Sequence, residues 1–335
     1  MNKVLCFGEI LLRLSPDVNG QWISNATMPA YLGGAELNVA QALSKWNIPV
    51  AYCSALPENY MSARILEHLT SANIDVNKMH KSGSRIGIYY LAQGTDLKHA
   101  EVIYDRAFSS TAMLQPGEIN WDEVLDGVSW FHFSAISPAI NENVAIVCKE
   151  ALHTASKKGI TISVDLNYRA KLWKWGKQPS DVMPELATYC NVVMGNIWAA
   201  ETMLQVPIPK NFNTDKESCI KQAEETSRAI IQRFPNCRQV ANTFRFDCGD
   251  GLQYYGTNFT ADRLYVSQEH TVTGVADKVG SGDCFMAGLI YSDHNKLSPQ
   301  QAIDFSAAAA VDKMFVVGDA TTSTAEQIKK RAQLV

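Results

Sequence analysis

Short apolar runs alternate along most of the chain with segments that have the spacing of an amphipathic helix. Between the first two runs, the apolar side chains from Val39 to Trp46 follow the i, i+3, i+4, i+7 spacing of one helix face. Alternating strands and helices predict an α/β fold with a mostly parallel sheet covered by helices on both faces. The strands are predicted at 4–7, 50–55, 130–134, 160–164, 192–194 and 239–241, and further helices at 60–72, 141–158, 216–233 and 299–315.

Two regions interrupt this alternation, residues 10–32 and 85–108. The second contains the β-rich pieces 86–91 and 101–104 with no helix between them. Successive strands without a crossover helix predict antiparallel pairing and a small separate sheet. Such a sheet, attached to an α/β domain, is suited to act as a lid that excludes water from a site. We therefore expect a single domain over 1–335, with a lid formed by about 10–32 and 85–108.

Composition narrows the function classes. The formal net charge of -4 gives no general attraction to nucleic acid or to anionic membranes, so neither is an expected partner. The eight cysteines include no C-x-x-C pair and no zinc-like spacing, which indicates reduced thiols and a cytoplasmic protein. The sequence starts in a strand-like run without a leader, and no uncharged apolar stretch reaches the ~18–20 residues that span a bilayer.

The strongest chemical signal is the segment Asp277-Lys-Val-Gly-Ser-Gly-Asp283, which runs into an apolar helical pattern. Gly280 and Gly282 permit a tight turn and the close approach of a ligand. The free N–H groups of a helix start, at Gly280, Ser281 and Gly282, can hold a phosphate or a developing negative charge. A carboxylate at Asp283 would then accept a proton from a substrate hydroxyl while the N–H groups hold the transferring phosphoryl group.

A bare G-x-G-D sequence is more often an ordinary helix start with an acidic cap or first-turn residue than a phosphate site. No G-x-G-x-x-G follows the first predicted strand, which disfavours a dinucleotide-dependent oxidoreductase. The chain also lacks G-x-x-x-x-G-K-[ST] and the protein-kinase signatures. A phosphate-transferring activity would therefore use a different loop.

With its flanks, the segment resembles the signature of the ribokinase-like, PfkB-type carbohydrate kinases, D-T-x-G-A-G-D. Lys278 stands in place of the Thr and Ser281 in place of the Ala. A second block near the N-terminus, Gly-Gly-Ala-Glu-Leu-Asn-Val-Ala over 33–40, matches the family's G-G-x-x-x-N-x-A. Two motifs in the expected order at the expected ends are far more specific than either alone. The similarity extends from about residue 3 to about residue 320.

The resemblance implies a ribokinase-like fold and transfer of the γ-phosphate of ATP, with Mg²⁺, to a sugar hydroxyl. It makes Asp283 the catalytic base. Asp277 falls where some members place a ligand of a monovalent cation, and the sequence leaves open whether this chain binds one. The other implied positions are an anion hole at Gly280, Ser281 and Gly282, sugar contacts at Gly33, Gly34 and Asn38, and nucleotide contacts at Asn196, Thr243, Gly280 and Gly282.

Within the family, the details resemble the 2-keto-3-deoxygluconate kinases. The opening over 8–16 is similar to theirs, and Arg13 stands where many other members keep a sugar-binding Asp. Ile103-Tyr-Asp-Arg106 matches the subgroup's Y-x-R, and the block over 163–173 matches its D-x-N-x-R-x-x-L-W. The substrate positions that this resemblance implies are Gly34, Tyr89, Tyr104, Arg106, Ile136 and Arg169.

The chemistry of a sugar acid agrees with two arginines at such positions. A planar guanidinium holds a carboxylate through paired, charge-assisted hydrogen bonds, whereas a neutral sugar needs no such clamp. We therefore expect a kinase that converts 2-keto-3-deoxygluconate to its 6-phosphate, and leave its oligomeric state open, a homo-oligomer included. The alternatives are a fructokinase-like enzyme, another sugar kinase of the family, and a weakly active sugar-binding homologue.

Three departures from the family pattern keep the last alternative open. After Asn196 the usual N-x-x-E motif has Ala199 in place of the Glu, which helps to arrange metal and phosphate in many members. The expected nucleotide turn after 239–241 is longer and carries Arg245 where a small residue is common. Lys278 lies within the signature itself. These changes leave adenine recognition and metal arrangement open.

Overall fold

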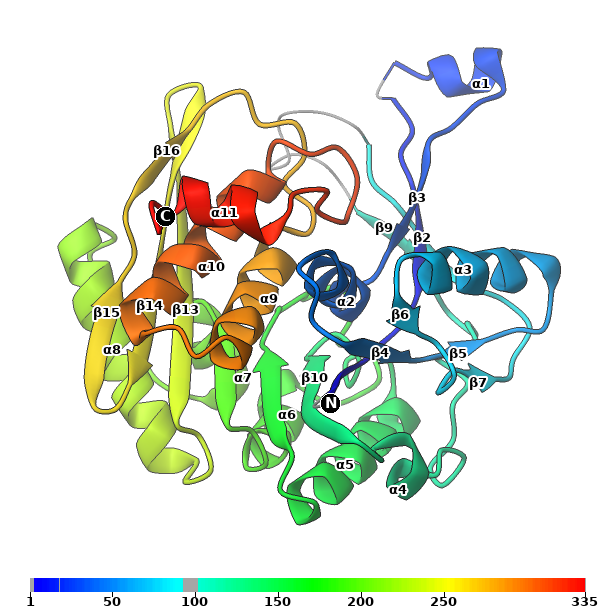
Figure 1. The fold of residues 1–335 in the computed structure, drawn as a ribbon, viewed down its shortest axis with the longest axis horizontal. Helices are drawn as coiled ribbons and strands as arrows, with labels where there is room; N and C mark the ends of the chain where they lie inside the picture. The colour runs from blue at the N-terminus through cyan, green and yellow to red at the C-terminus, as the bar shows by residue number, and fades with distance from the viewer. Residues whose placement is uncertain (1–2, 18, 93–101, 335) are drawn as a thin grey trace.

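The structure, a computed structural model, describes residues 3–17, 19–92 and 102–334. Its main layer is a sheet of ten strands in the order β15-β14-β13-β12-β11-β10-β1-β4-β6, with β16 beside β14 (Figure 1). The strands are β1 (Lys3–Phe7), β4 (Val50–Cys53), β6 (Ile74–Asp75), β10 (Val128–Ser134), β11 (Thr161–Asp165), β12 (Val192–Gly195), β13 (Gln239–Cys248), β14 (Gly251–Thr260), β15 (Arg263–Val266) and β16 (His270–Val272). The pairs from β6 to β13 are parallel, and β14 pairs antiparallel with β13, β15 and β16. All six predicted strands are present.

Helices cover both faces of this sheet, as the sequence pattern predicts. In β1, Val4 and Cys6 belong to one hydrophobic core while Leu5 and Phe7 belong to the other, so the strand is buried on both sides. The first core lies under α2 (Ala35–Lys45), α3 (Tyr60–Ser71), α9 (Ser281–His294), α10 (Pro299–Lys313) and α11 (Ala325–Arg331). The second is covered by α4 (Trp121–Val124), α5 (Glu142–Lys157), α6 (Pro179–Ala187), α7 (Ile197–Leu204) and α8 (Lys216–Arg233).

A four-stranded sheet stands at one side of the main body, in the order β3-β2-β8-β9 (Figure 1). Its strands are β2 (Leu11–Leu14), β3 (Ala30–Gly33), β8 (Gly87–Tyr90) and β9 (Ile103–Asp105), and the short helix α1 (Gln21–Asn25) lies beyond β2 and β3. Residues 18 and 93–101 of the expected lid lie outside the described residues. A two-stranded parallel sheet of β5 (Ala55–Leu56) and β7 (His80–Lys81) completes the strands.

The small sheet is confirmed, and so is the antiparallel pairing predicted for successive strands within each of its two regions. β2 pairs antiparallel with β3, and β8 with β9, whereas β2 and β8 are parallel. The chain between β3 and β8 passes through α2, β4 and α3 of the main body. That long excursion serves as the crossover that a parallel pair needs. The sequence pattern makes no prediction about how the two regions pair with each other, because that pairing depends on this crossover.

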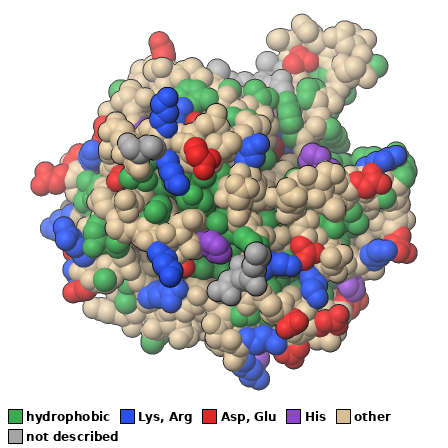
Figure 2. All heavy atoms as spheres, viewed as in Figure 1, with side chains coloured by type: hydrophobic (Ala, Val, Ile, Leu, Met, Phe, Trp, Pro, Cys, Tyr) green, Lys and Arg blue, Asp and Glu red, His purple; other side chains and the backbone are tan. Residues whose placement is uncertain are grey.

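The surface agrees with the composition. Figure 2 shows side chains of both charge signs interspersed over the visible face of the molecule. Across the described residues, none of the helices combines the length and the apolar character needed to cross a membrane.

Candidate active site

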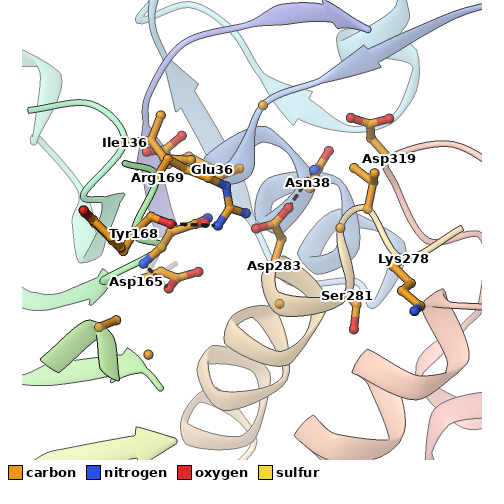
Figure 3. A pocket seen from close by; sticks show the side chains of 18 of the residues that line it. Glu36, Asn38, Ile136, Asp165, Tyr168, Arg169, Lys278, Ser281, Asp283 and Asp319 are labelled. Atoms are coloured by element: carbon orange, nitrogen blue, oxygen red, sulfur yellow. Dashed lines mark hydrogen bonds between the residues drawn. The ribbon is translucent and has the colours of Figure 1, made fainter. Parts of the chain in front are cut away.

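A pocket of about 790 Å³ lies between the carboxyl ends of the main-sheet strands, the small sheet and the start of α9 (Figure 3). The carboxyl edge is where ligands bind in parallel α/β sheets. Segments far apart in the sequence meet here. The predicted site residues that line it are Gly34, Asn38, Tyr89, Tyr104, Arg106, Ile136, Arg169, Asn196, Thr243, Gly280, Ser281, Gly282 and Asp283. Gly33 and Asp277 are not among the lining residues.

The G-S-G-D segment forms the first turn of α9. Gly280 is the N-cap with φ 79°, and a Cβ atom there would lie 2.0 Å from the carbonyl oxygen of Asp319, so only glycine fits. The first N–H groups of a helix have no carbonyl partner within it. Ser281 contributes only its backbone to the pocket, because its hydroxyl donates to the carbonyl of Ala310 at 3.0 Å. The turn therefore offers N–H groups to an anion.

Asp283 follows this turn and is buried, with an exposed fraction of 8%. The side-chain amide of Asn38 donates to Asp283 Oδ2 at 2.7 Å, which joins the two sequence motifs across 245 residues (Figure 3). Burial is the largest cause that raises the pKa of Asp283, to about 8, and the Asn38 hydrogen bond opposes it. Nearby Asp165 raises this pKa further, while Arg169 lowers it. The pKa of the Asp283 carboxyl group is therefore well above the ordinary range of an aspartate.

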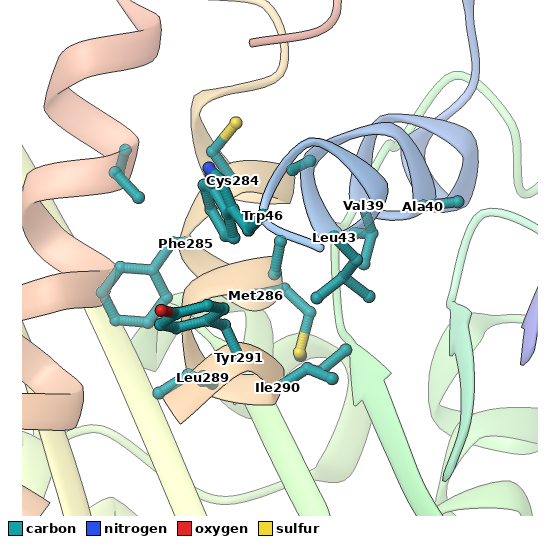
Figure 4. Close-up of a cluster of buried hydrophobic side chains, with 14 of the residues drawn as sticks. Val39, Ala40, Leu43, Trp46, Cys284, Phe285, Met286, Leu289, Ile290 and Tyr291 are labelled. Atoms are coloured by element: carbon teal, nitrogen blue, oxygen red, sulfur yellow. The ribbon is translucent and has the colours of Figure 1, made fainter. Parts of the chain in front are cut away.

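Packing between α2 and α9 holds this pair in register. Leu43 of α2 and Trp46, which caps the end of α2, lie against the α9 side chains around Met286 in one continuous buried cluster (Figure 4). At the start of α2, Gly34 has φ 136°, and a Cβ there would lie 2.4 Å from the carbonyl oxygen of Glu9. The glycine thus lets the chain turn directly from β3 into the helix that carries Asn38.

Gly33, where the family resemblance implies a sugar contact, does not itself line the pocket. A Cβ atom on Gly33 would lie 2.2 Å from Asp319 Oδ2. The missing side chain therefore makes room for Asp319, which lines the pocket and accepts a hydrogen bond from the Tyr89 hydroxyl at 2.5 Å. The absence of a side chain at Gly33 thus lets the Asp319 carboxylate lie close to the backbone of β3.

Sequence reasoning missed four carboxylates of the pocket: Glu9, Glu36, Asp165 and Asp319. Asp165 ends β11, where it accepts the Asn167 N–H at 2.9 Å, and burial raises its pKa to about 6. Glu36 is buried and accepts hydrogen bonds from Ser134, so it braces the start of α2 against β10. The signal for Asp165 was present, since it directly ends a predicted strand within the block that contains Arg169.

The cations of the pocket differ in how far they are already neutralised. Arg106 forms a buried ion pair with Glu9, and Lys278 lies 3.7 Å from Asp247 Oδ1. Within the described chain, neither Arg169 nor Arg245 forms an ion pair. Figure 3 shows the guanidinium of Arg169 extending from the loop after β11 toward Asp283. Arg169 is therefore better placed than Arg106 to hold an additional anionic group.

The nucleotide positions differ from the expected turn. β13 continues to Cys248 and pairs with β14 along its whole length, so Thr243 and Arg245 lie on a strand and not in a glycine turn. Alternation along the strand turns both toward the pocket, while Phe244 between them is buried in a separate core. The side chain of Asn196 caps α7 by accepting the Ala199 N–H at 2.8 Å. Ala199 itself lines the pocket in place of the missing Glu.

In the described part of the chain, no three His, Cys, Asp or Glu side chains are grouped as a metal site. Proteins commonly bind Mg²⁺ through one or two carboxylates together with substrate phosphates and water, and the pocket contains carboxylates such as Asp165. At Asp277 the carboxylate already has partners with which a monovalent cation would have to compete. The Asp277 carboxylate is ion-paired with Arg13, 2.6 Å away, and also accepts the N–H groups of Val279 and Gly318.

The two glycines of the anion turn, the segment Gly280-Ser-Gly282, should respond differently to replacement by alanine. At Gly282 an added methyl would meet only Met194 Cε, 4.0 Å away, so Gly282→Ala should fold with a parental melting temperature. Its methyl projects into ligand space, and we expect KM for the phosphate donor to rise and kcat to fall. Gly280→Ala should instead melt several degrees lower, because its positive φ and the Asp319 carbonyl exclude a side chain.

Calorimetry and steady-state kinetics on both variants check this contrast. If Gly282→Ala keeps parental kcat and KM, the turn is only a helix cap.

Comparison with known proteins places this site in a family. The model of the pfkB family carbohydrate kinases matches residues 1–234. The chain is 28% identical over 334 residues to 2-dehydro-3-deoxygalactonokinase of Haloferax volcanii, covering 98% of this chain and 96% of that protein. The crystal structure of 2-dehydro-3-deoxygluconokinase from Thermotoga maritima superposes with a TM-score of 0.90, at 29% identity, over 99% of this chain and 98% of that one.

A fructokinase from Xylella fastidiosa, solved with bound ATP, shares the fold at lower similarity. Its TM-score is 0.74 and its identity 16%, over 99% of this chain and 98% of that one. The chain belongs to the pfkB family of carbohydrate kinases, and its fold is the ribokinase-like α/β fold.

Proposed function

We propose that this carbohydrate kinase uses ATP and Mg²⁺ to phosphorylate a 2-keto-3-deoxy sugar acid, with 2-keto-3-deoxygluconate and its 6-hydroxyl as the first choice. The observation that carries the proposal is Arg169, whose guanidinium extends toward Asp283 without a carboxylate partner among the described residues. A substrate with a carboxylate supplies the missing partner. The relatives named for 2-dehydro-3-deoxy sugar acids, the same class of compound, support this choice.

The groups around Asp283 divide the proposed reaction between them. The substrate hydroxyl gives its proton to the Asp283 carboxylate, and its oxygen forms the new bond to the γ-phosphorus of ATP. The bond from that phosphorus to the β–γ bridging oxygen breaks, and ADP leaves. The N–H groups at the start of α9 hold the transferring phosphoryl group. Mg²⁺, when bound, neutralises charge on the phosphate oxygens.

The pocket shields both the Asp283 carboxylate and the transferring phosphoryl group from water. Asn38 orients the Asp283 carboxylate and occupies one of its oxygens, which leaves the other free to face the substrate. The small sheet lines the pocket through Tyr89 and Tyr104, and Arg106 lines it directly after β9. We assign the small sheet the role of a lid that excludes water from the phosphoryl group. The cavity volume of about 790 Å³ is in the range of about 300–1,000 Å³ that ligand sites occupy.

A coupled ADP-release screen tests the proposal directly. Purified protein with ATP and Mg²⁺ should turn over 2-keto-3-deoxygluconate and its galactonate epimer with a kcat/KM far above that for fructose and other neutral ketoses. Equal or better turnover of a neutral ketose would replace the assignment with a fructokinase-like one. If none of these sugars causes ADP release, although the preparation binds a nucleotide analogue, a weakly active sugar-binding homologue would be favoured.

A further inference from the structure

A cluster of buried charges lies beside the anion turn and reaches the pocket at Asp319. Arg13 of β2 is its centre: its guanidinium lies 2.6 Å from Asp277 Oδ2 and 2.9 Å from Asp319 Oδ1. Its side chain is only 3% exposed, and the Asp319 side chain only 1%. Asp277 lies three residues before Gly280, at the start of the segment that ends at Asp283, and the Asp319 carbonyl occupies the space that a Cβ atom on Gly280 would need. The cluster therefore connects the small sheet to the turn.

Lys313, the last residue of α10, enters the same region from below. It is fully buried, and its Nζ donates to the carbonyl of Val316 at 2.9 Å. Its Cε lies 3.3 Å from the position that a Cβ of Gly280 would take. The carbonyl-rich C-terminal end of a helix favours a cation, and the charges of Asp277 and Asp319 oppose the lowering of the Lys313 pKa that burial causes.

This geometry matches the surroundings that a monovalent cation seeks, with buried carboxylates and a loop carbonyl directly under a phosphate-binding turn. Here two side-chain cations already take those partners. The Asp277 carboxylate has one ion pair and two N–H donors, and the Val316 carbonyl accepts from Lys313. A K⁺ ion would have to displace Lys313 or compete with Arg13 for the same oxygens.

We propose that Lys313 and Arg13 supply from within the chain the positive charge that a bound monovalent cation would supply here, so that this kinase needs no K⁺. Lys313 acts as a positioning residue: it holds the loop after α10 against Gly280, and thereby holds the N–H groups of the turn toward the phosphate. Arg13 couples that turn to β2, the strand on which it lies, where it stands opposite Tyr89 of β8. The proposal rests on the kinase family and not on the choice of sugar.

The first test needs only the parent protein. Affinity for the Mg²⁺ complex of a non-hydrolysable ATP analogue, measured by calorimetry, should agree within about twofold between KCl and N-methylglucamine chloride at an equal ionic strength of about 0.1 M, where screening is the same. ADP release with any accepted sugar should show the same indifference. An increase of more than about fivefold in KCl, in either measurement, overturns the proposal.

Two variants test the part assigned to Lys313. Lys313→Met keeps most of the volume and removes the charge, so analogue affinity should fall about tenfold in any salt, in line with the loss of one charged hydrogen bond. Lys313→Ala leaves space beside the Val316 carbonyl, and KCl, but not N-methylglucamine chloride, should restore its affinity and raise its melting temperature. A Lys313→Met protein with parental affinity, or a Lys313→Ala protein indifferent to K⁺, contradicts the assignment.

These measurements separate the inference from the proposed substrate. Analogue binding uses no sugar, so a failure of the sugar-acid assignment leaves the salt comparison intact. Should Lys313→Met not fold, the comparison on the parent protein still decides whether K⁺ is needed.

Discussion

Replacing Asp283 with Asn should lower kcat by about 10²–10⁴-fold while leaving ATP affinity largely unchanged, as is typical when a positioned base is lost. The change keeps the size of the side chain and its position beside Asn38, and removes only the ability to accept a proton. Steady-state kinetics with the accepted sugar acid, and calorimetry with an ATP analogue, measure the two quantities separately. Near-parental kcat in this variant would end the assignment of Asp283 as the base.

The pH dependence gives an independent readout of the same group. Since burial raises the pKa of Asp283 to about 8, the basic form becomes scarcer as the pH falls below that value. In the parent, kcat/KM should therefore fall about tenfold per pH unit on the acid side of an apparent pKa near 8, because this ratio reports the free enzyme. In Asp283→Asn the residual activity should not show this fall at acid pH.

Stability should change in the opposite direction from activity. A folded-state pKa above the ordinary value means that the folded protein binds this proton more tightly than the unfolded chain does. The stability contributed by Asp283 is therefore present at acid pH and is lost as the pH rises through about 8. Asp283→Asn, which has no charge to bury, should melt at a higher temperature than the parent at pH 9 and differ less at pH 6. A variant that melts lower at both pH values would indicate that its lost activity reflects misfolding.

Replacing Arg169 with Ala should cost roughly 10- to 150-fold in kcat/KM for the sugar acid, because a hydrogen bond to a charged group contributes about 1.5–3 kcal/mol. Slow turnover of a neutral ketose should barely change, so the preference for the acid collapses. Arg169→Lys should lose much of the same preference, since an ammonium does not reproduce the planar fork of a guanidinium. The informative quantity is the ratio of kcat/KM values for the two substrates, measured in parent and variants.

Arg245, another arginine that lines the same pocket, offers a matched control. Like Arg169, it lines the pocket and makes no ion pair in the described part of the chain, but it extends from β13 beside Thr243. Arg245→Ala should alter KM for ATP and leave the acid-to-ketose ratio unchanged. If Arg169→Ala slows both sugars equally, or if Arg245→Ala shifts the ratio more than Arg169→Ala does, the sugar-acid assignment loses its main physical support.

For Arg106, the structure shows a partner that the sequence motif does not predict. Its Y-x-R motif predicts a second guanidinium for the substrate carboxylate, and it does line the pocket. However, Glu9 already pairs with it, and the Ser109 hydroxyl donates to the same carboxylate. A buried arginine that has a carboxylate partner gains less from a second one, because its charge is already compensated. We therefore expect Arg169 to contribute more than Arg106 to discrimination.

The sequence by itself determined the elements and the chemistry of the anion turn. Six strands and the amphipathic helices could be predicted because the spacing of apolar residues shows whether an element is buried on one face or on both. This spacing is a local property of the chain. The start of α9 was readable for the same reason, since glycine freedom and free N–H groups act within a few residues. The family signature then supplied the roles of Asp283 and of the substrate positions as predictions.

Only the tertiary structure decided which charges are neutralised and which are free. Arg13 and Asp277 are 264 residues apart in the sequence, yet they form a buried ion pair. The parallel pairing of β2 with β8 depended on a crossover through the main body, and the position of Gly33 depended on Asp319. Ion pairs and strand neighbours join residues that are remote along the chain, and their energies depend on burial and distance. Apolar periodicity carries no information about either, so these features follow only from the folded arrangement.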